Sequence, residues 1–197
     1  NADSSDIATT NVSFNGIVVS GNPAAGADTF GIIAKFNTSL NTQLSGYDYS
    51  QSIESVAFDI AGDAYATFDD PDTGTAGILV GNRVAKSRDT ESFDTARDRV
   101  IAGENTGLVT PKGLDVASNS GLLFVAENNA TTPGILVFSL CASGDAAPVL
   151  TLNLADNARP WDVDYDASTD RAYVALTNGT VAVFDEVTAR MNSGMTT

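Results

Sequence analysis

Residues 159–185 alternate apolar and polar side chains in three short runs. The first run contains Trp161, Val163 and Tyr165, and an Asn-Gly turn at 178–179 separates the second run from the third. Alternation with a period of two, broken by residues that favour tight turns, is typical of antiparallel strands joined by hairpins. This segment therefore predicts a three-stranded antiparallel sheet.

The same order of runs and turns recurs three more times along the chain. Aligning Pro111 with Pro160 matches two segments strand by strand, at an offset of 49 residues (160 − 111). Glu54 aligns with Lys112 in the same way, and Ile7 with Val163. Recurrence at a period of this length is typical of proteins built from structural repeats. The four repeats cover approximately residues 1–50, 51–110, 111–158 and 159–197.

Each repeat has the same internal order of strands. The third strand is the clearest, and it reads GIIAKF (31–36), GILVGN (77–82), GILVFS (134–139) and TVAVFD (180–185). A weaker fourth strand precedes the next repeat, at 43–50, 99–105 and 149–154, whereas 186–197 is polar and short. The first strands contain Val56, Leu114 and Val163 at equivalent positions, where we expect buried side chains.

A β-propeller blade consists of four antiparallel strands and occupies about 40 to 50 residues, which is the spacing of these repeats. A single sheet of this kind cannot bury its faces alone, so blades stack around an axis. A β-sandwich also contains many short strands, but it does not predict recurrence at a fixed interval. The sequence therefore predicts an all-β chain, a single β-propeller domain built from four-stranded antiparallel blades.

Two segments, AYVALTNGTVAVFD (172–185) and LLFVAENNATTPGILVFSL (122–140), carry a resemblance to known proteins. They resemble the YVTN-type and NHL-like propeller repeats of bacterial and archaeal secreted or cell-surface proteins. The resemblance implies a secreted or cell-surface location, with the periplasm as an alternative. Because this family includes surface-layer components, binding scaffolds and calcium-dependent hydrolases, it implies a fold and not an activity.

Closed propellers of this family usually contain six or seven blades, whereas four repeats fill this chain. Either the ring is four-bladed or this is part of a longer propeller. The polar segment 1–6 does not provide a convincing strand to seal the ring. We therefore expect an incomplete ring, with the remaining blades in a missing segment or supplied by another chain.

The charge of the chain excludes several kinds of partner. Ten Lys and Arg residues stand against 25 Asp and Glu residues, for a formal net charge of −15. This charge repels nucleic acid phosphates and anionic lipid surfaces. The sequence has no apolar run near the ~18 residues that a membrane helix needs. We expect no nucleic acid partner and no membrane span, which leaves a protein or a small molecule.

The residue types that are absent narrow the chemistry further. The sequence has no histidine and one cysteine, Cys141. This excludes Ser-His-Asp and Cys-His nucleophile systems, histidine-ligated zinc or copper, and an internal disulfide. We expect Cys141 to be a buried structural thiol.

Polar residues are expected to converge at one end of the propeller channel. The innermost strand of each blade runs along the channel, and it contributes the equivalent residues Glu54, Lys112 and Trp161. The loops between second and third strands share this face and contribute Asp69, Asp70, Glu127, Asn128 and Asn178. Carboxylate and amide oxygens from several blades suit a hard cation such as calcium, although the sequence favours solvated loop residues over a metal site. Trp161 is either an aromatic platform for a ligand or, as its alternation favours, part of the core between blades.

A second candidate metal site lies in the turn after the first strand of the last repeat. Asp164, Asp166 and Asp170 begin with the alternating oxygen ligands of a calcium loop. The segment lacks the glycine and the downstream glutamate of an EF-hand, and Asx-turn chemistry explains it adequately. The charged insertion 87–99 is expected to be a solvated surface element.

Two functions of different classes remain. The first is a non-enzymatic extracellular or cell-surface scaffold or binding module, which agrees with the lack of histidine and of any nucleophile-base motif. The second is a calcium-dependent hydrolase or lactonase with its site at the central channel, where the ion would polarise the substrate and activate water. The sequence favours the first and does not identify a ligand.

Overall fold

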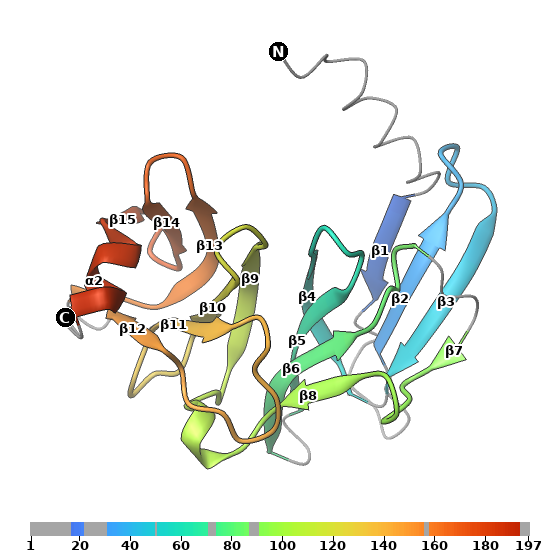
Figure 1. Ribbon diagram of the computed structural model, residues 1–197, viewed down its shortest axis with the longest axis horizontal. Helices are drawn as coiled ribbons and strands as arrows, with labels where there is room; N and C mark the ends of the chain where they lie inside the picture. Colours follow the sequence, from blue (N-terminus) through green and yellow to red (C-terminus); the bar gives the residue numbers. More distant parts are fainter. Residues whose placement is uncertain are drawn as a thin grey trace.

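The computed structural model describes residues 17–21, 31–49, 51–70, 74–86, 91–155 and 158–193. Four β-sheets follow one another along the chain and form an arc (Figure 1). Several predicted features lie wholly or partly outside the described residues. These are the polar segment 1–6, the strand near Ile7, the last residue of the strand 43–50, part of the loop after Asp70 (71–73), part of the insertion (87–90) and the end of the polar tail (194–197).

The sheets contain the following strands. The first sheet consists of β1 (Ile17–Gly21), β2 (Gly31–Phe36), β3 (Gln43–Tyr49) and β7 (Glu91–Ser92). The second consists of β4 (Ile53–Phe58), β5 (Ala64–Asp70), β6 (Thr75–Gly81) and β8 (Arg99–Ile101). The third consists of β9 (Pro111–Ala117), β10 (Leu122–Glu127), β11 (Gly134–Ser139) and β12 (Leu150–Asn153). The fourth consists of β13 (Pro160–Asp166), β14 (Arg171–Leu176) and β15 (Val181–Asp185). The short helices η1 (Glu104–Thr106) and α2 (Val187–Ser193) follow β8 and β15.

These sheets are the blades that the repeats predict. In the second and third sheets, the strands pair in chain order from β4 to β8 and from β9 to β12, and all of these pairs are antiparallel. The fourth sheet stops after three strands among the described residues, and α2 follows it in the segment expected to lack a strand. The all-β propeller fold is therefore confirmed.

The core lies between consecutive sheets, because each blade buries one face on its neighbour. Ile33 and Tyr47 of the first sheet pack with Ile53 and Phe68 of the second. Ile78 and Val80 of the second sheet pack with Leu123 and Val125 of the third. Phe124 and Val137 of the third sheet pack with Val163 and Val174 of the fourth.

The inner strands β4, β9 and β13 lie side by side at the concave side of this stack. Their equivalent residues follow the predicted register, since Leu114 and Val163 are buried and Val56 is half-buried. The inner ends of three blades therefore meet, as the repeat alignment requires. No helix among the described residues is both long and apolar enough to cross a membrane.

The described part of the insertion differs from the solvated element expected there. Glu91 and Ser92 form β7, which pairs in parallel with Tyr47 and Asp48 of β3. Asp98 is buried, and its carboxylate accepts hydrogen bonds from the Tyr47 hydroxyl (2.9 Å) and from the backbone N–H of Asn82 (2.9 Å). The insertion therefore ties the first sheet to the second.

Cys141 is exposed and not the buried thiol that we expected. It lies in the turn that follows β11, where its backbone N–H donates to the Ser139 hydroxyl at 3.2 Å. The apolar strand β11 ends before this position, so the thiol falls outside the core.

Candidate functional site

Each of the three inner strands carries an irregularity near its start. In β4 the pairing with β5 skips Glu54, and in β13 the pairing with β14 skips Trp161. In β9, Lys112 and Gly113 together stand opposite Ala126 of β10. Such a β-bulge interrupts the alternation of a strand and redirects the side chain at the extra position. The three bulges occupy equivalent places in three blades, so they redirect three equivalent side chains.

These side chains meet around one open cavity of about 110 Å³. The cavity is lined by Glu54, Ser55, Lys112, Gly113, Trp161 and Asp162. The structure therefore brings together the three residues that the repeat alignment placed at the channel. It also adds Asp162, which sequence reasoning did not select.

Trp161 is not part of the core between blades. Its side chain is 57% exposed, whereas Val163 and Tyr165 on the same strand are buried. The bulge between Pro160 and Asp162 breaks the alternation on which the core prediction depended. Of the two interpretations of Trp161, the exposed position agrees with the aromatic platform.

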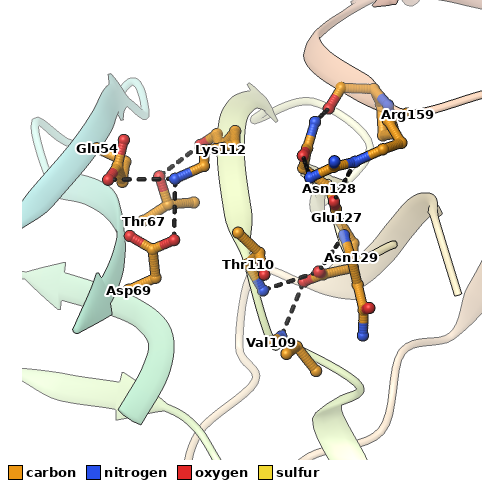
Figure 2. Close-up of polar contacts among 11 residues, drawn as sticks. Glu54, Thr67, Asp69, Val109, Thr110, Lys112, Glu127, Asn128, Asn129 and Arg159 are labelled. Carbon is orange, nitrogen blue, oxygen red and sulfur yellow. Dashed lines mark hydrogen bonds and ion pairs between the residues drawn. The ribbon is translucent and has the colours of Figure 1, made fainter. Parts of the chain in front are cut away.

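Lys112 forms an ion-pair network with two carboxylates from the second blade. Its Nζ lies 3.2 Å from Oε1 of Glu54 and 2.9 Å from Oδ2 of Asp69 (Figure 2). The three side chains are only 15% (Lys112), 22% (Glu54) and 18% (Asp69) exposed, so the solvent screens them less than it screens surface pairs. The Thr67 hydroxyl also donates to the backbone carbonyl of Lys112 at 2.5 Å. The second and third blades are thereby joined at the channel.

Burial and charge together set the ionisation of this cluster. Burial raises the pKa of Glu54 and the neighbouring Asp69 raises it further, against the opposing effect of Lys112. Burial alone would lower the pKa of Lys112, but Asp69 and Glu54 outweigh it and the pKa is raised. Burial also raises the pKa of Asp162. Lys112 stays cationic, and the carboxylates around it outnumber it.

Glu127 lies outside the cavity and has a structural position. It is fully buried, and its carboxylate accepts the backbone N–H groups of Val109 (2.9 Å), Thr110 (2.8 Å) and Asn129 (2.9 Å) (Figure 2). Burial raises the pKa of Glu127, while these three hydrogen bonds oppose the rise. The residue fixes the loop that leads into β9, and thereby the bulge at Lys112.

Asn128 has a similar position between the third and fourth blades. The side-chain amide of Asn128 donates to the backbone carbonyl of Pro160 at 2.5 Å. The backbone carbonyl of Asn128 accepts a hydrogen bond from Nε of Arg159 at 2.9 Å (Figure 2). The guanidinium of Arg159 also donates to Oδ1 of Asn128. These bonds hold the residues that precede Trp161, so Asn128 positions the cavity wall without lining it.

Two further candidates are not brought into the cavity. Asp70 is the last residue of β5 and is half-buried. Asn178 is exposed in the hairpin between β14 and β15, where its side-chain oxygen accepts the backbone N–H of Thr180 at 3.0 Å. Asn178 therefore contributes to its own turn.

The aspartates of the predicted calcium loop have separate partners. Asp166 accepts hydrogen bonds from the backbone and hydroxyl of Ser168 (2.8 and 2.6 Å) and from the hydroxyl of Thr169, and these lower its pKa to about 2. Asp170 accepts from the hydroxyl of Tyr165 at 2.8 Å and from the backbone of Thr188 at 3.0 Å. Asp164 is exposed on β13. No group of three or more carboxylate, cysteine or histidine side chains within the described ranges could hold a metal ion. Calcium binding stays a prediction.

The bulges are the feature that sequence reasoning missed. A signal was present, because Pro111 and Pro160 begin two of the inner strands and Gly113 follows the first of them. Proline in a strand is confined to edges, first positions and bulges, and glycine in a strand often marks a bulge. The Cβ of any other residue at position 113 would meet Oδ1 of Asp162 at 1.9 Å.

Comparison with known proteins adds little to this site. No protein-family model matches the sequence, and no curated protein matches it. Among solved structures, the chain is similar to one in a nidogen/laminin complex, with a TM-score of 0.40 and 15% sequence identity, over 86% of this chain and 73% of the other. At this level of similarity, the comparison carries no argument about function.

Proposed function

We propose that this chain is a non-enzymatic binding module on a β-propeller scaffold, and that it binds a lysine or arginine side chain of a protein partner. The cavity at the starts of β4, β9 and β13 is the binding site. We place the module outside the cell or at its surface, in keeping with its repeat type and its strongly acidic composition.

The observation that carries this proposal is the exposed indole of Trp161 on an acidic cavity. Glu54 and Asp162 line the cavity and Asp69 pairs with Lys112, so three carboxylates accompany a single ammonium group. A cation over the face of a tryptophan gains about 0.5 to 2 kcal/mol, more as water is excluded. Since the cavity holds about 110 Å³, it suits the head of one side chain and not a larger ligand.

The sole tryptophan provides a direct test, because its fluorescence reports on the cavity alone. The probes are N-acetylarginine amide and the neutral N-acetylglutamine amide. We expect a saturable change in Trp161 emission with the arginine probe and no saturable change with the glutamine probe. An equal response to both probes, or none to either, would contradict the proposal.

Two matched variants distinguish the site from the general acidity of the chain. Glu54→Gln removes a cavity carboxylate and should weaken binding of the arginine probe about fivefold, as expected for the loss of ~1 kcal/mol of ionic attraction. Glu104→Gln makes the same chemical change at an exposed position in η1 and should leave binding unchanged. Equal weakening by both variants would assign the binding to net charge.

A further inference from the structure

The fourth sheet has one face whose side chains belong to no core cluster among the described residues. Its inward face packs on the third sheet through Val163, Tyr165, Ala172 and Val174. Its opposite face, which we call the forward face, carries Asp164, Tyr173, Ala175, Val181 and Val183. Val181 is 63% exposed and Val183 is 49% exposed. Two neighbouring valines on one face of a regular strand are therefore left in water.

This forward face repeats a face that is covered elsewhere in the same molecule. At the offset of 49 residues, Tyr173 corresponds to Phe124 and Ala175 to Ala126. Their partners on the next strand also correspond, since Phe124 pairs with Val137 and Ala126 with Ile135, as Tyr173 pairs with Val183 and Ala175 with Val181. The four residues of the third sheet are fully buried. They are buried because the fourth sheet packs on them.

One polar contact of the covered face is repeated as well. Oδ2 of Asp115 on β9 accepts the backbone N–H of Tyr165 on β13 at 2.9 Å, which links one inner strand to the next. The ring of Tyr165 stacks on Phe124 at 4.5 Å between centroids. Asp164 is the equivalent of Asp115 at the same offset, and it is exposed on the forward face. The forward face therefore has the same two features that bind the next blade elsewhere in the molecule. These are an apolar surface and a carboxylate that can accept a backbone N–H of the next inner strand.

We propose that the forward face of the fourth sheet is a docking surface for a further β-sheet blade, contributed by a partner polypeptide of different sequence. The partner blade would present alternate aliphatic or aromatic side chains, as the fourth sheet does to the third, and a backbone N–H to Asp164. This surface is distinct from the cavity at Trp161, so the proposal does not depend on the binding of cationic side chains.

Charge favours a different polypeptide over a second copy of this chain. Each copy has a formal net charge of −15. The border of the forward face carries Asp166, Arg171 and Asp185 in register, and Arg171 is ion-paired with Asp185. Two copies would repel each other through their net charge, whereas lysine or arginine residues at the rim of a partner blade would complement that charge.

The test supplies a blade of known structure by extending the full chain. Because Asp185 corresponds to Ser139 in the hairpin register, residues 1–185 can be followed directly by a second copy of 140–193. The first Val183 is replaced by cysteine, and Cys141 by serine in both copies. We expect the thiol at position 183 to react at least about tenfold more slowly with a disulfide reagent in the extended chain than in the original chain, since packing protects it.

A matched control is available at Ile60, which is 75% exposed in the turn after β4. Ile60→Cys should react equally fast in both chains, and a single cooperative thermal transition identifies the folded state. A second extension, in which residues 82–155 follow Asp185, offers the third sheet as the added blade if the first extension does not fold. The proposal would be overturned if the thiol at position 183 reacted equally fast in the original chain and in an extended chain that folds.

Sedimentation of the unextended chain tests the source of the blade. We expect a monomer up to a concentration of about 100 µM, as the mutual repulsion of two acidic copies requires. A dimer that Val183→Asp dissociates would assign the forward face to a second copy and would overturn the choice of a different polypeptide.

Discussion

Glu127 is a fully buried carboxylate whose three hydrogen bonds all come from backbone N–H groups. Glu127→Ala would remove the acceptor of all three donors and leave a cavity at a fully buried position, and we expect it to lower the free energy of unfolding by roughly 2 to 5 kcal/mol. Glu127→Gln keeps one oxygen acceptor and should have a smaller effect. Denaturant unfolding measures both changes, and an unchanged midpoint for Glu127→Ala would show that the carboxylate is dispensable.

The pH dependence of this contribution has a definite sign. Burial raises the folded-state pKa of Glu127 above its ordinary value of 4.5, so the folded state binds the proton more tightly than the unfolded state does. Stability from this group therefore rises as the pH falls from the raised value to 4.5. Glu127→Gln should remove that rise and leave the remaining pH dependence intact.

Sequence reasoning predicted three of the residues that line the channel cavity, but not how each one points, and it also placed there several residues that lie outside the cavity. Glu54, Lys112 and Trp161 follow from the register of the repeats alone, since equivalent positions of neighbouring blades must lie side by side. The exposure of Trp161 could not be predicted from alternation, because one extra residue in a strand reverses the face of its side chain. The role of Glu127 was missed because its donors are backbone groups, which carry no residue-type signal.

Among the strands, β9 shapes the cavity through its bulge. Gly113→Ala would place a Cβ 1.9 Å from Oδ1 and 2.7 Å from Cα of Asp162, so β13 must move away from β9. We expect a loss of about 1 to 3 kcal/mol of stability, typical of overpacking, together with weaker binding of the arginine probe. Thermal unfolding and the Trp161 titration measure the two effects.

The control for this variant is Asp162→Ala in the Gly113→Ala background. Removing the carboxylate relieves the shortest approach and should restore part of the stability, although the new methyl group still crowds the backbone of residue 162. If Gly113→Ala alone is as stable as the original chain, the approach of β13 to β9 is looser than the structure has it.

The strands with strong alternation were predictable, and the elements fixed by distant contacts were not. The third strands of all four repeats coincide with β2, β6, β11 and β15 within two residues. The two-residue strand β7 has too little sequence to form a pattern, and its pairing with Tyr47 and Asp48 depends on a tertiary contact. Helix α2 was missed for a related reason, because Val187 is buried against the third and fourth sheets and polar residues follow it.

The molecule as a whole is an arc of four blades, in which the first and fourth sheets lie at opposite ends (Figure 1). Completion of the ring by further blades stays a prediction from the repeats. The same forward face is covered in the first three blades and exposed in the fourth, so the repeat that builds the core also creates the proposed docking surface. The channel cavity arises from the same repetition, since equivalent bulges in three adjacent blades supply its walls.

Aligned bulges in neighbouring blades place Trp161 at the wall of an acidic cavity, with its indole exposed to water. Charge-selective quenching of Trp161 fluorescence tests this arrangement, with caesium as the cationic quencher and iodide as the anionic one. We expect the emission of a water-exposed indole and a ratio of caesium to iodide quenching above that of free N-acetyltryptophan amide, because the surrounding carboxylates attract cations and repel anions. Emission typical of a buried indole with no quenching by either ion, or a ratio below that of the free amide, would contradict it.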